Sequence, residues 1–194
     1  MRKTFIIADT HFGDSSIITS IGRDFESVKE MDSFMIEKWN SVVSKDDDII
    51  VAGDFIRLPR ENQKEYVENI LGRLNFHTLE LVVGNHDTED LLEIMRDYSK
   101  NINIYRYPIV KDNFWIVSHE PMFVNERTVW VNIFGHVHNN PSYRDISSHS
   151  MCVSTERLDY TPIEWEKVKE SVIQVSRKEL ERFETVSYTH LRAH

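Results

Sequence analysis

Short apolar runs rich in isoleucine, valine and phenylalanine recur along the chain, and each has the length of a strand. Most of their positions are apolar on both sides of an extended backbone, which is expected when a sheet is covered on both faces. The longer runs occupy residues 5–8, 49–52, 79–83, 114–117 and 129–134. Similar strand-like pieces lie at 102–107 and 151–153. The pattern therefore predicts a protein rich in strands.

Helical spacing of apolar residues predicts helices between the runs of the first half. A helix is expected over about residues 26–43, where one stripe contains Val28, Met31, Met35, Trp39 and Val42. The same spacing recurs at 66–74 and 88–98, and Thr88 is suited to cap the third helix. Pro162 is expected to begin a last helix. The first half thus alternates strands and helices, which indicates an α/β fold.

The second half changes character, because strand-like pieces from residue 101 onward follow one another without long helices. This arrangement predicts a second sheet or an antiparallel extension of the first. No linker or repeat interrupts residues 1–180, so we expect a single domain there and a C-terminal tail at 181–194. Residues 186–194 resemble a translated sequencing adapter and are expected to be non-native or disordered. A frayed natural C-terminus is the alternative.

Composition narrows the class of protein. The 194 residues carry a formal charge of −9 and include 28% charged and 40% hydrophobic residues, with no apolar run long enough to cross a bilayer. The acidic balance disfavours a broad nucleic-acid-binding surface, although it allows a phosphate substrate met by metal ions. The lone Cys152 and the absence of a signal-peptide pattern favour the cytoplasm. The oligomeric state is left open.

Polar residues that can bind metals follow five of the apolar runs. They are Asp9-Thr10-His11, Gly53-Asp54, Gly84-Asn85-His86-Asp87, Ser118-His119 and Gly135-His136-Val137-His138. Because ligands bind beyond the carboxyl ends of strands in α/β sheets, we expect these segments to meet at one site. Their oxygen and nitrogen donors suit ions such as Mn²⁺, Fe²⁺, Zn²⁺ or Co²⁺. Seven side chains exceed the needs of one tetrahedral ion, so two divalent ions are predicted.

This ordered set of motifs, from residue 4 to about 165, resembles the calcineurin-like metallophosphoesterase superfamily. The segments at residues 8–13 and 39–43 look most like its small, capless bacterial and phage members. The resemblance implies a four-layer αββα sandwich, in which two mixed β-sheets are flanked by helices. It also implies two bound divalent ions, with Mn²⁺ preferred and Fe²⁺, Zn²⁺, Co²⁺ or Ni²⁺ as alternatives.

The resemblance also implies a role for each polar residue. Asp9, His11 and His138 would hold the first ion, and Asp54 would bridge the two. The second ion would be held by Asn85, His119 and His136. His86 would be the acid that protonates the leaving oxygen, and Asp87 would fix the His86 ring.

Three arginines are candidates for binding the substrate phosphate, namely Arg23, Arg57 and Arg60. Relatives with a similar start to the chain often carry histidine where this sequence has Asp14, so a substrate contact on that side is in doubt. The expected substrate is a small phosphoester or nucleotide-like molecule.

The expected activity is hydrolysis of phosphodiesters, phosphomonoesters or both, by attack of a hydroxide that bridges the two ions. A small nuclease remains open within that class. A metal-binding interaction module of the same fold without catalysis is the alternative from another class. All seven ligands and His86 are present, which favours an enzyme.

Overall fold

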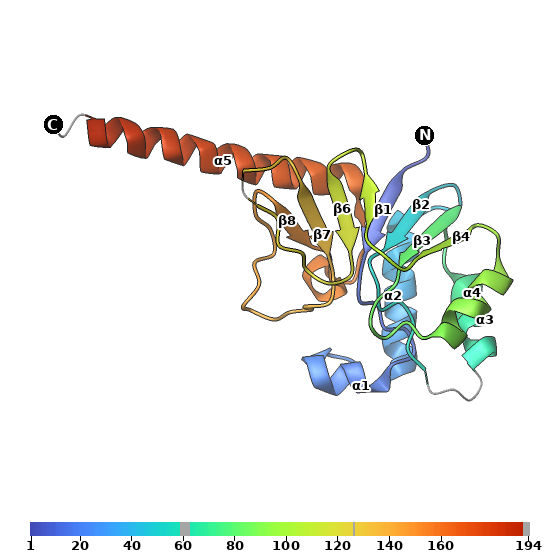
Figure 1. Cartoon of the computed structure of the whole chain (residues 1–194). Coiled ribbons are helices and arrows are strands. Elements are labelled where there is room, and N and C mark those ends of the chain that lie inside the picture. The colour runs from blue at the N-terminus through green and yellow to red at the C-terminus, as the bar shows by residue number, and fades with distance from the viewer. Residues whose placement is uncertain (59–62, 126, 192–194) are drawn as a thin grey trace.

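The computed structural model describes residues 1–58, 63–125 and 127–191, and its strands form two mixed sheets flanked by helices. The five-stranded sheet has the order β4-β3-β2-β1-β9, and the four-stranded sheet has the order β5-β6-β7-β8 (Figure 1). The strands are β1 (Thr4–Ile7), β2 (Asp48–Val51), β3 (Thr78–Val82), β4 (Ile102–Tyr105), β5 (Ile109–Lys111), β6 (Trp115–Ser118), β7 (Val131–Phe134), β8 (Ser150–Cys152) and β9 (Ile163–Glu164). The predicted α/β class with two mixed sheets is confirmed.

Within each sheet the central strands run parallel, and one edge strand runs the other way. β1, β2, β3 and β4 pair in parallel, and β9 pairs antiparallel to β1. In the second sheet β6, β7 and β8 are parallel, whereas β5 is antiparallel to β6. Because parallel strands end on the same side, the loops after β1, β2 and β3 emerge together, as do those after β6 and β7.

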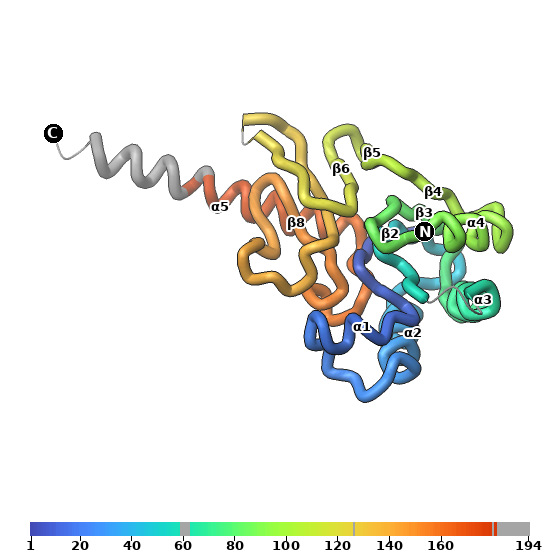
Figure 2. The backbone as a smooth tube through the Cα atoms, turned by 60° about the horizontal axis from the view of Figure 1, so that its bottom comes forward, coloured from blue at the N-terminus to red at the C-terminus, as the bar shows by residue number. Residues whose placement is uncertain are grey.

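Helices cover the outer face of the five-stranded sheet. They are α2 (Val28–Val42), α3 (Gln63–Arg73) and α4 (Glu89–Tyr98), of which α3 and α4 lie side by side (Figures 1 and 2). Alternation along β1 explains the layers, since Phe5 and Ile7 pack toward these helices while Ile6 and Ala8 pack toward the other sheet. Ser27 and Thr88 cap α2 and α4, as predicted for Thr88.

Helix α5 (Trp165–Leu191) contacts β1, β9 and β8, so it touches both sheets. Pro162 does not begin this helix as predicted. Ile163 and Glu164 extend beside β1 as β9, and the helix starts only at Trp165. The tail boundary proposed at residue 180 lies within α5, and the foreign origin of residues 186–194 stays a prediction. Among the described residues, no helix combines the length and apolar character needed to cross a membrane.

Two short elements were not predicted. A brief helical segment, α1 (Ser15–Ile17) continued by a π-helical turn (Ile18–Gly22), follows the first polar motif. The Asp14 side chain caps it by accepting a hydrogen bond from the Ser16 amide. A 3₁₀ helix, η2 (Thr155–Leu158), follows β8. The first of these elements lies between the predicted site residues His11 and Arg23 in the sequence.

Candidate metal centre

The loops after five strands bring all seven predicted ligands into one connected group. On one side, Asn85 Oδ1 lies 2.9 Å from His119 Nε2 and 3.0 Å from His136 Nδ1. The two imidazoles approach each other to 3.2 Å between these nitrogens. Asn85 and His136 are exposed, whereas His119 is buried. The three predicted ligands of the second ion therefore meet at the solvent-facing edge of the site.

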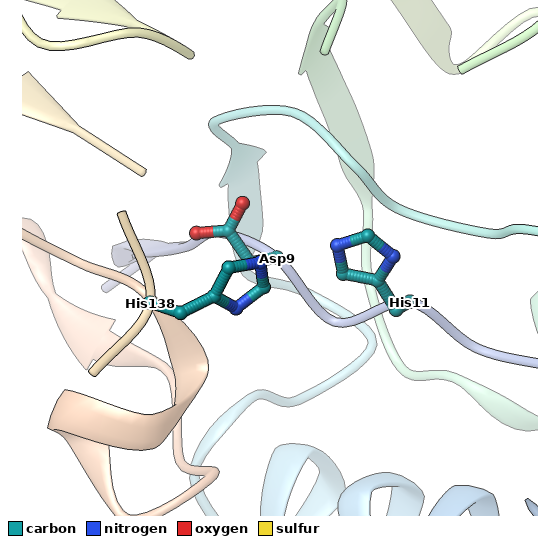
Figure 3. A group of neighbouring side chains, drawn as sticks. All are labelled: Asp9, His11 and His138. Carbon is teal, nitrogen blue, oxygen red and sulfur yellow. The ribbon is translucent and has the colours of Figure 1, made fainter. Parts of the chain in front are cut away.

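On the other side lie Asp9, His11 and His138, whose ligand atoms are all within 4.8 Å of one another. Figure 3 shows the Asp9 carboxylate beside the His138 ring, with His11 on the same loop as Asp9. Asp9 and His11 are almost completely buried, and His138 is partly buried. This trio matches the predicted ligands of the first ion.

Asp54 joins the two sides. Its Oδ2 lies 3.4 Å from His11 Nε2 and 3.4 Å from His119 Nε2. Asp9, Asp54 and His119 form a second group whose ligand atoms lie within 4.8 Å of one another. A carboxylate that faces a histidine from each trio has the position expected of a bridging ligand.

The donor set fits a divalent ion. Both ring nitrogens of His11 are buried and have no hydrogen-bond partner among the described residues. A buried imidazole without a partner is costly unless something else satisfies its nitrogen. A cation bound by His11 together with neighbouring carboxylates would do so, and oxygen and nitrogen donors are those that borderline divalent ions prefer.

The backbone at the ligands is strained. Five of the seven have left-handed φ angles, at Asp9 (57°), His11 (50°), Asp54 (52°), His136 (69°) and His138 (48°). Such angles are uncommon outside glycine and cluster at functional sites, where the surrounding structure holds them in place. These angles occur in the loops after β1, β2 and β7, where the candidate site residues come together.

Glycines next to the ligands allow close approach. Gly53 has a φ of 86°, and a Cβ at this position would lie 2.2 Å from His119 Nδ1. A Cβ at Gly84 would lie 2.3 Å from Asp54 Oδ1. Any larger residue at Gly53 or Gly84 would therefore displace a predicted ligand.

The charges of the centre depend on one another. Burial acts to lower the pKa of His119, but the adjacent Asp54 carboxylate outweighs it and raises this pKa to about 9. Burial acts to raise the pKa of Asp54, but the adjacent His11 and His119 imidazoles bring it well below its ordinary value. Protons on the imidazoles thus balance the buried carboxylates. A divalent cation can replace these protons and supply the same compensation.

Asp87 does not contact the ring of His86 as the resemblance implied. Its Oδ2 accepts hydrogen bonds from the amides of Gly84 (2.8 Å) and Asp54 (2.9 Å), and its Oδ1 accepts one from Phe55 (2.9 Å). Asp87 therefore fastens the loop after β2 to the loop after β3. The turn after Gly84, closed by a hydrogen bond from the Asp87 amide to the Gly84 carbonyl, brings the carboxylate to these three amides instead.

His86 itself faces the centre. Its amide donates a 2.8 Å hydrogen bond to Asp54 Oδ1, and its ring centroid lies 5.4 Å from that of His11. Burial lowers the pKa of His86, Asp54 opposes this effect, and the positive charge of Arg57 adds to it. An anion bound beside the ring would raise the pKa again and favour the protonated form.

The three candidate phosphate-binding arginines differ in their surroundings. The side chain of Arg57 is 44% exposed and pairs with Asp14 at 3.2 Å, so one side of its guanidinium remains open to solvent. Arg23, by contrast, has a fully buried side chain that is bonded to the protein on all sides. Because it cannot reach a substrate, Arg23 is corrected to a structural role. Arg60 lies outside the described residues.

Asp14, where the resemblance implied that many relatives carry histidine, approaches two other candidate site residues. Its Oδ2 lies 3.5 Å from His11 Nδ1 and 3.2 Å from Arg57 Nη1. Burial acts to raise the pKa of Asp14, but the adjacent His11 ring and hydrogen bonds from Ser16 keep it well below its ordinary value. Asp14 thus lies between a predicted metal ligand and an arginine.

Sequence reasoning missed Glu156, which accepts a hydrogen bond from His138 Nδ1 at 3.0 Å. A signal was present, because Glu156 follows the apolar run at 151–153 just as the other site residues follow their runs. The rule that found the seven ligands was not applied to this short last strand.

Comparison with known proteins settles the family. The family model described as calcineurin-like phosphoesterase matches residues 2–169, which is most of the chain. This chain belongs to the calcineurin-like phosphoesterase family. The predicted family is therefore confirmed, and the Asp and His clusters of the chain are a potential metal-binding site.

The chain is also similar to a protein of Methanocaldococcus jannaschii and to a crystal structure from Aquifex aeolicus. It is 30% identical over 171 residues to an uncharacterized protein of Methanocaldococcus jannaschii, MJ1445, covering 84% of this chain and 87% of the relative. It also resembles the crystal structure of AQ665 from Aquifex aeolicus, a protein of unknown function, with a TM-score of 0.65. That match covers 88% of this chain and 99% of the other at 24% identity, so it shows the fold alone.

Proposed function

We propose that this protein is a two-metal phosphoesterase that hydrolyses phosphodiesters, phosphomonoesters or both. The observation that carries the proposal is the unbroken series of contacts from His138 and Asp9 through Asp54 to His119, Asn85 and His136. Asp9, His11 and His138 would hold one ion. Asn85, His119 and His136 would hold the other, with Asp54 shared. When bound, two such ions supply Lewis acidity and lower the pKa of water toward neutrality.

His86 is proposed to donate the proton that the leaving oxygen needs. It lies beside His11, is partly exposed, and is held through its own amide by Asp54. Its ring can therefore reach a substrate while its backbone is fixed relative to the bridging carboxylate. A phosphate anion at the centre would favour its protonated form before the transfer.

Arg57 is proposed to bind a phosphoryl oxygen of the substrate. Asp14 holds its guanidinium from one side, and its influence on the pKa of His86 places it within electrostatic range of the proposed acid. The exposed edge formed by Asn85 and His136 supports a small phosphoester or nucleotide-like substrate that enters from solvent. A manganese-dependent enzyme of the cytoplasm is the form of this proposal that we would test first.

The decisive experiment compares two reporters, bis-p-nitrophenyl phosphate and p-nitrophenyl phosphate, with added Mn²⁺ before and after chelation. Turnover that disappears on chelation and returns with Mn²⁺ would support the phosphoesterase. The ratio of the two rates would separate diester from monoester preference, and a nucleotide panel including 2′,3′-cyclic forms would follow.

A binding module of the same fold is the alternative outcome. No turnover of either reporter by protein that demonstrably holds two ions would favour it. Cleavage of short oligonucleotides at rates far above those for both reporters would favour a small nuclease.

A further inference from the structure

Two buried residues outside the ligand set, Arg23 and Glu156, connect the two loops that supply the first trio of ligands. The side chains of Arg23 and Glu156 are 0% and 8% exposed. Glu156 Oε1 accepts hydrogen bonds from Arg23 Nε (2.9 Å), Arg23 Nη2 (2.7 Å) and His138 Nδ1 (3.0 Å). One carboxylate oxygen therefore receives an arginine fork and a histidine ring at the same time.

The contact with Glu156 determines which nitrogen of His138 is available. A carboxylate accepts hydrogen bonds but does not donate them, so the His138 proton must lie on Nδ1. In the neutral ring, Nε2 then keeps its lone pair free. Arg157, the next residue along the chain, donates from Nε to the His138 carbonyl at 2.5 Å. Neighbouring residues thus fix both the ring and the backbone of one ligand.

Arg23 performs the corresponding task on the opposite loop. Its Nη1 donates to the Thr10 carbonyl at 2.8 Å, and its Nη2 donates to the Asp9 carbonyl at 2.5 Å. These bonds hold the backbone between Asp9 and His11, where the φ angles are left-handed. The guanidinium also balances the charge of Glu156, which would otherwise be a buried carboxylate facing only a histidine.

We infer that Arg23 and Glu156 are positioning residues that preset the geometry of the first trio, Asp9, His11 and His138, for a divalent ion. This inference rests on the metal centre of the proposed function. Arg23 sets the backbone of the Asp9 loop, and Glu156 sets the orientation and the tautomer of His138. Partners of this kind typically change metal affinity about 10- to 100-fold when they are removed.

The test compares Glu156→Gln with Glu164→Gln as a matched control. Glu164 is also ion-paired, to Lys3 at 2.9 Å. It pairs with Phe5 near the N-terminal end of β1, whereas Asp9 follows the C-terminal end of that strand. Mn²⁺ titration by calorimetry, with bound metal counted by elemental analysis, should show one of two ions weakened about 10- to 100-fold in Glu156→Gln. The control should bind both ions as the wild type does. Excess Mn²⁺ should restore kcat in Glu156→Gln.

Nitrogen NMR of the metal-free wild-type protein provides a second readout that needs no variant to fold. The His138 ring should carry its proton on Nδ1. A ring protonated only on Nε2 would overturn the inference. Equal weakening of both ions together with a lowered melting temperature would also overturn it, because a merely structural role predicts that result.

The design separates this inference from the proposed function. If the wild-type protein binds no ion, the metal centre itself fails. If the wild-type protein binds two ions and Glu156→Gln binds both as tightly as the wild type does, only the positioning role fails. Arg23→Lys keeps the charge but cannot form the same fork, so it should weaken the same ion as Glu156→Gln does.

Discussion

The two halves of the centre are held in place by different means. His138, in the first trio, is oriented by the buried Glu156 carboxylate, which is itself paired with Arg23. His119, in the second trio, faces a neutral partner, since its Nδ1 lies 3.0 Å from the Ala52 carbonyl. The first trio is also more enclosed, because Asn85 and His136 of the second are exposed.

This difference has a chemical consequence. A charged partner increases the basicity of an imidazole more than a carbonyl does, and burial shields the ligands from competing water. The first trio is thus the better shielded from water, whereas two of the three members of the second trio are exposed. We expect the two ions to differ in affinity, with the first held more tightly.

The largest expected effect comes from removing the residue that joins the halves. Asp54→Asn should lower kcat/KM by more than about 10⁴-fold, beyond the usual contribution of a single general acid, because both ions lose a ligand. Reporter hydrolysis and metal content would measure the change. Asp46→Asn, in the exposed turn before β2, is the matched control. Retention of two ions and activity in Asp54→Asn would refute the bridging role.

A smaller loss is expected when the proposed acid is removed and both halves are kept. His86→Ala should reduce kcat by about 10²- to 10⁴-fold while two ions stay bound. The control is His77→Ala, because His77 precedes β3 whereas His86 follows it. The loss should shrink for reporters with better leaving groups, since these need less protonation. A uniform loss across leaving groups would argue against proton donation.

The comparison itself can be tested by removing metal gradually. A limiting chelator should remove the ion of Asn85, His119 and His136 first. The two affinities should differ by about 10-fold or more, because the hydrogen-bond partner of a metal-binding residue typically changes metal affinity by at least this factor. Elemental analysis at each step should pass through a one-ion form. His136→Ala should yield that one-ion form directly. Simultaneous loss of both ions at every chelator concentration would remove the distinction between the halves.

The smallest effect is expected at Arg57, whose side chain is partly exposed at the edge of the site. Arg57→Met should raise KM about 2- to 5-fold with little change in kcat, because a half-exposed charge contributes roughly 1 kcal/mol or less. Steady-state kinetics on both reporters would show it, with Arg2→Met at the opposite end of β1 as control. A fall in kcat without any change in KM would place Arg57 in a different role.

Local sequence patterns predicted most of the fold and the seven side chains that the structure brings together, because strands, helices and strand-end motifs are local features. The short β9 was missed, since two residues after Pro162 cannot be distinguished from a helix start without their partner strand. The mismatch at Asp87 arose in the same way, because the amides it bonds include those of Asp54 and Phe55, more than 30 residues away.

Long-range pairs limit what the sequence reveals about the site. Arg23 and Glu156 are 133 residues apart, and neither belongs to a recognisable motif. Arg23 was predicted to face the substrate because arginines bind phosphate, but its surroundings are determined only when the loop after β1 meets η2. The ligands could be listed from the sequence, whereas the residues that support them required the packed structure.

Five of the predicted ligands have left-handed φ angles, so the side chains that the proposed activity needs lie at positions where the backbone lowers thermal stability. Each such angle costs of the order of 1–3 kcal/mol at a residue other than glycine. Glycine would relax the chain at these positions and discard the side chain that the centre needs. A selection for thermal tolerance alone should therefore enrich glycine at Asp9, His11, Asp54, His136 and His138, and the survivors would be robust proteins without an enzyme's centre.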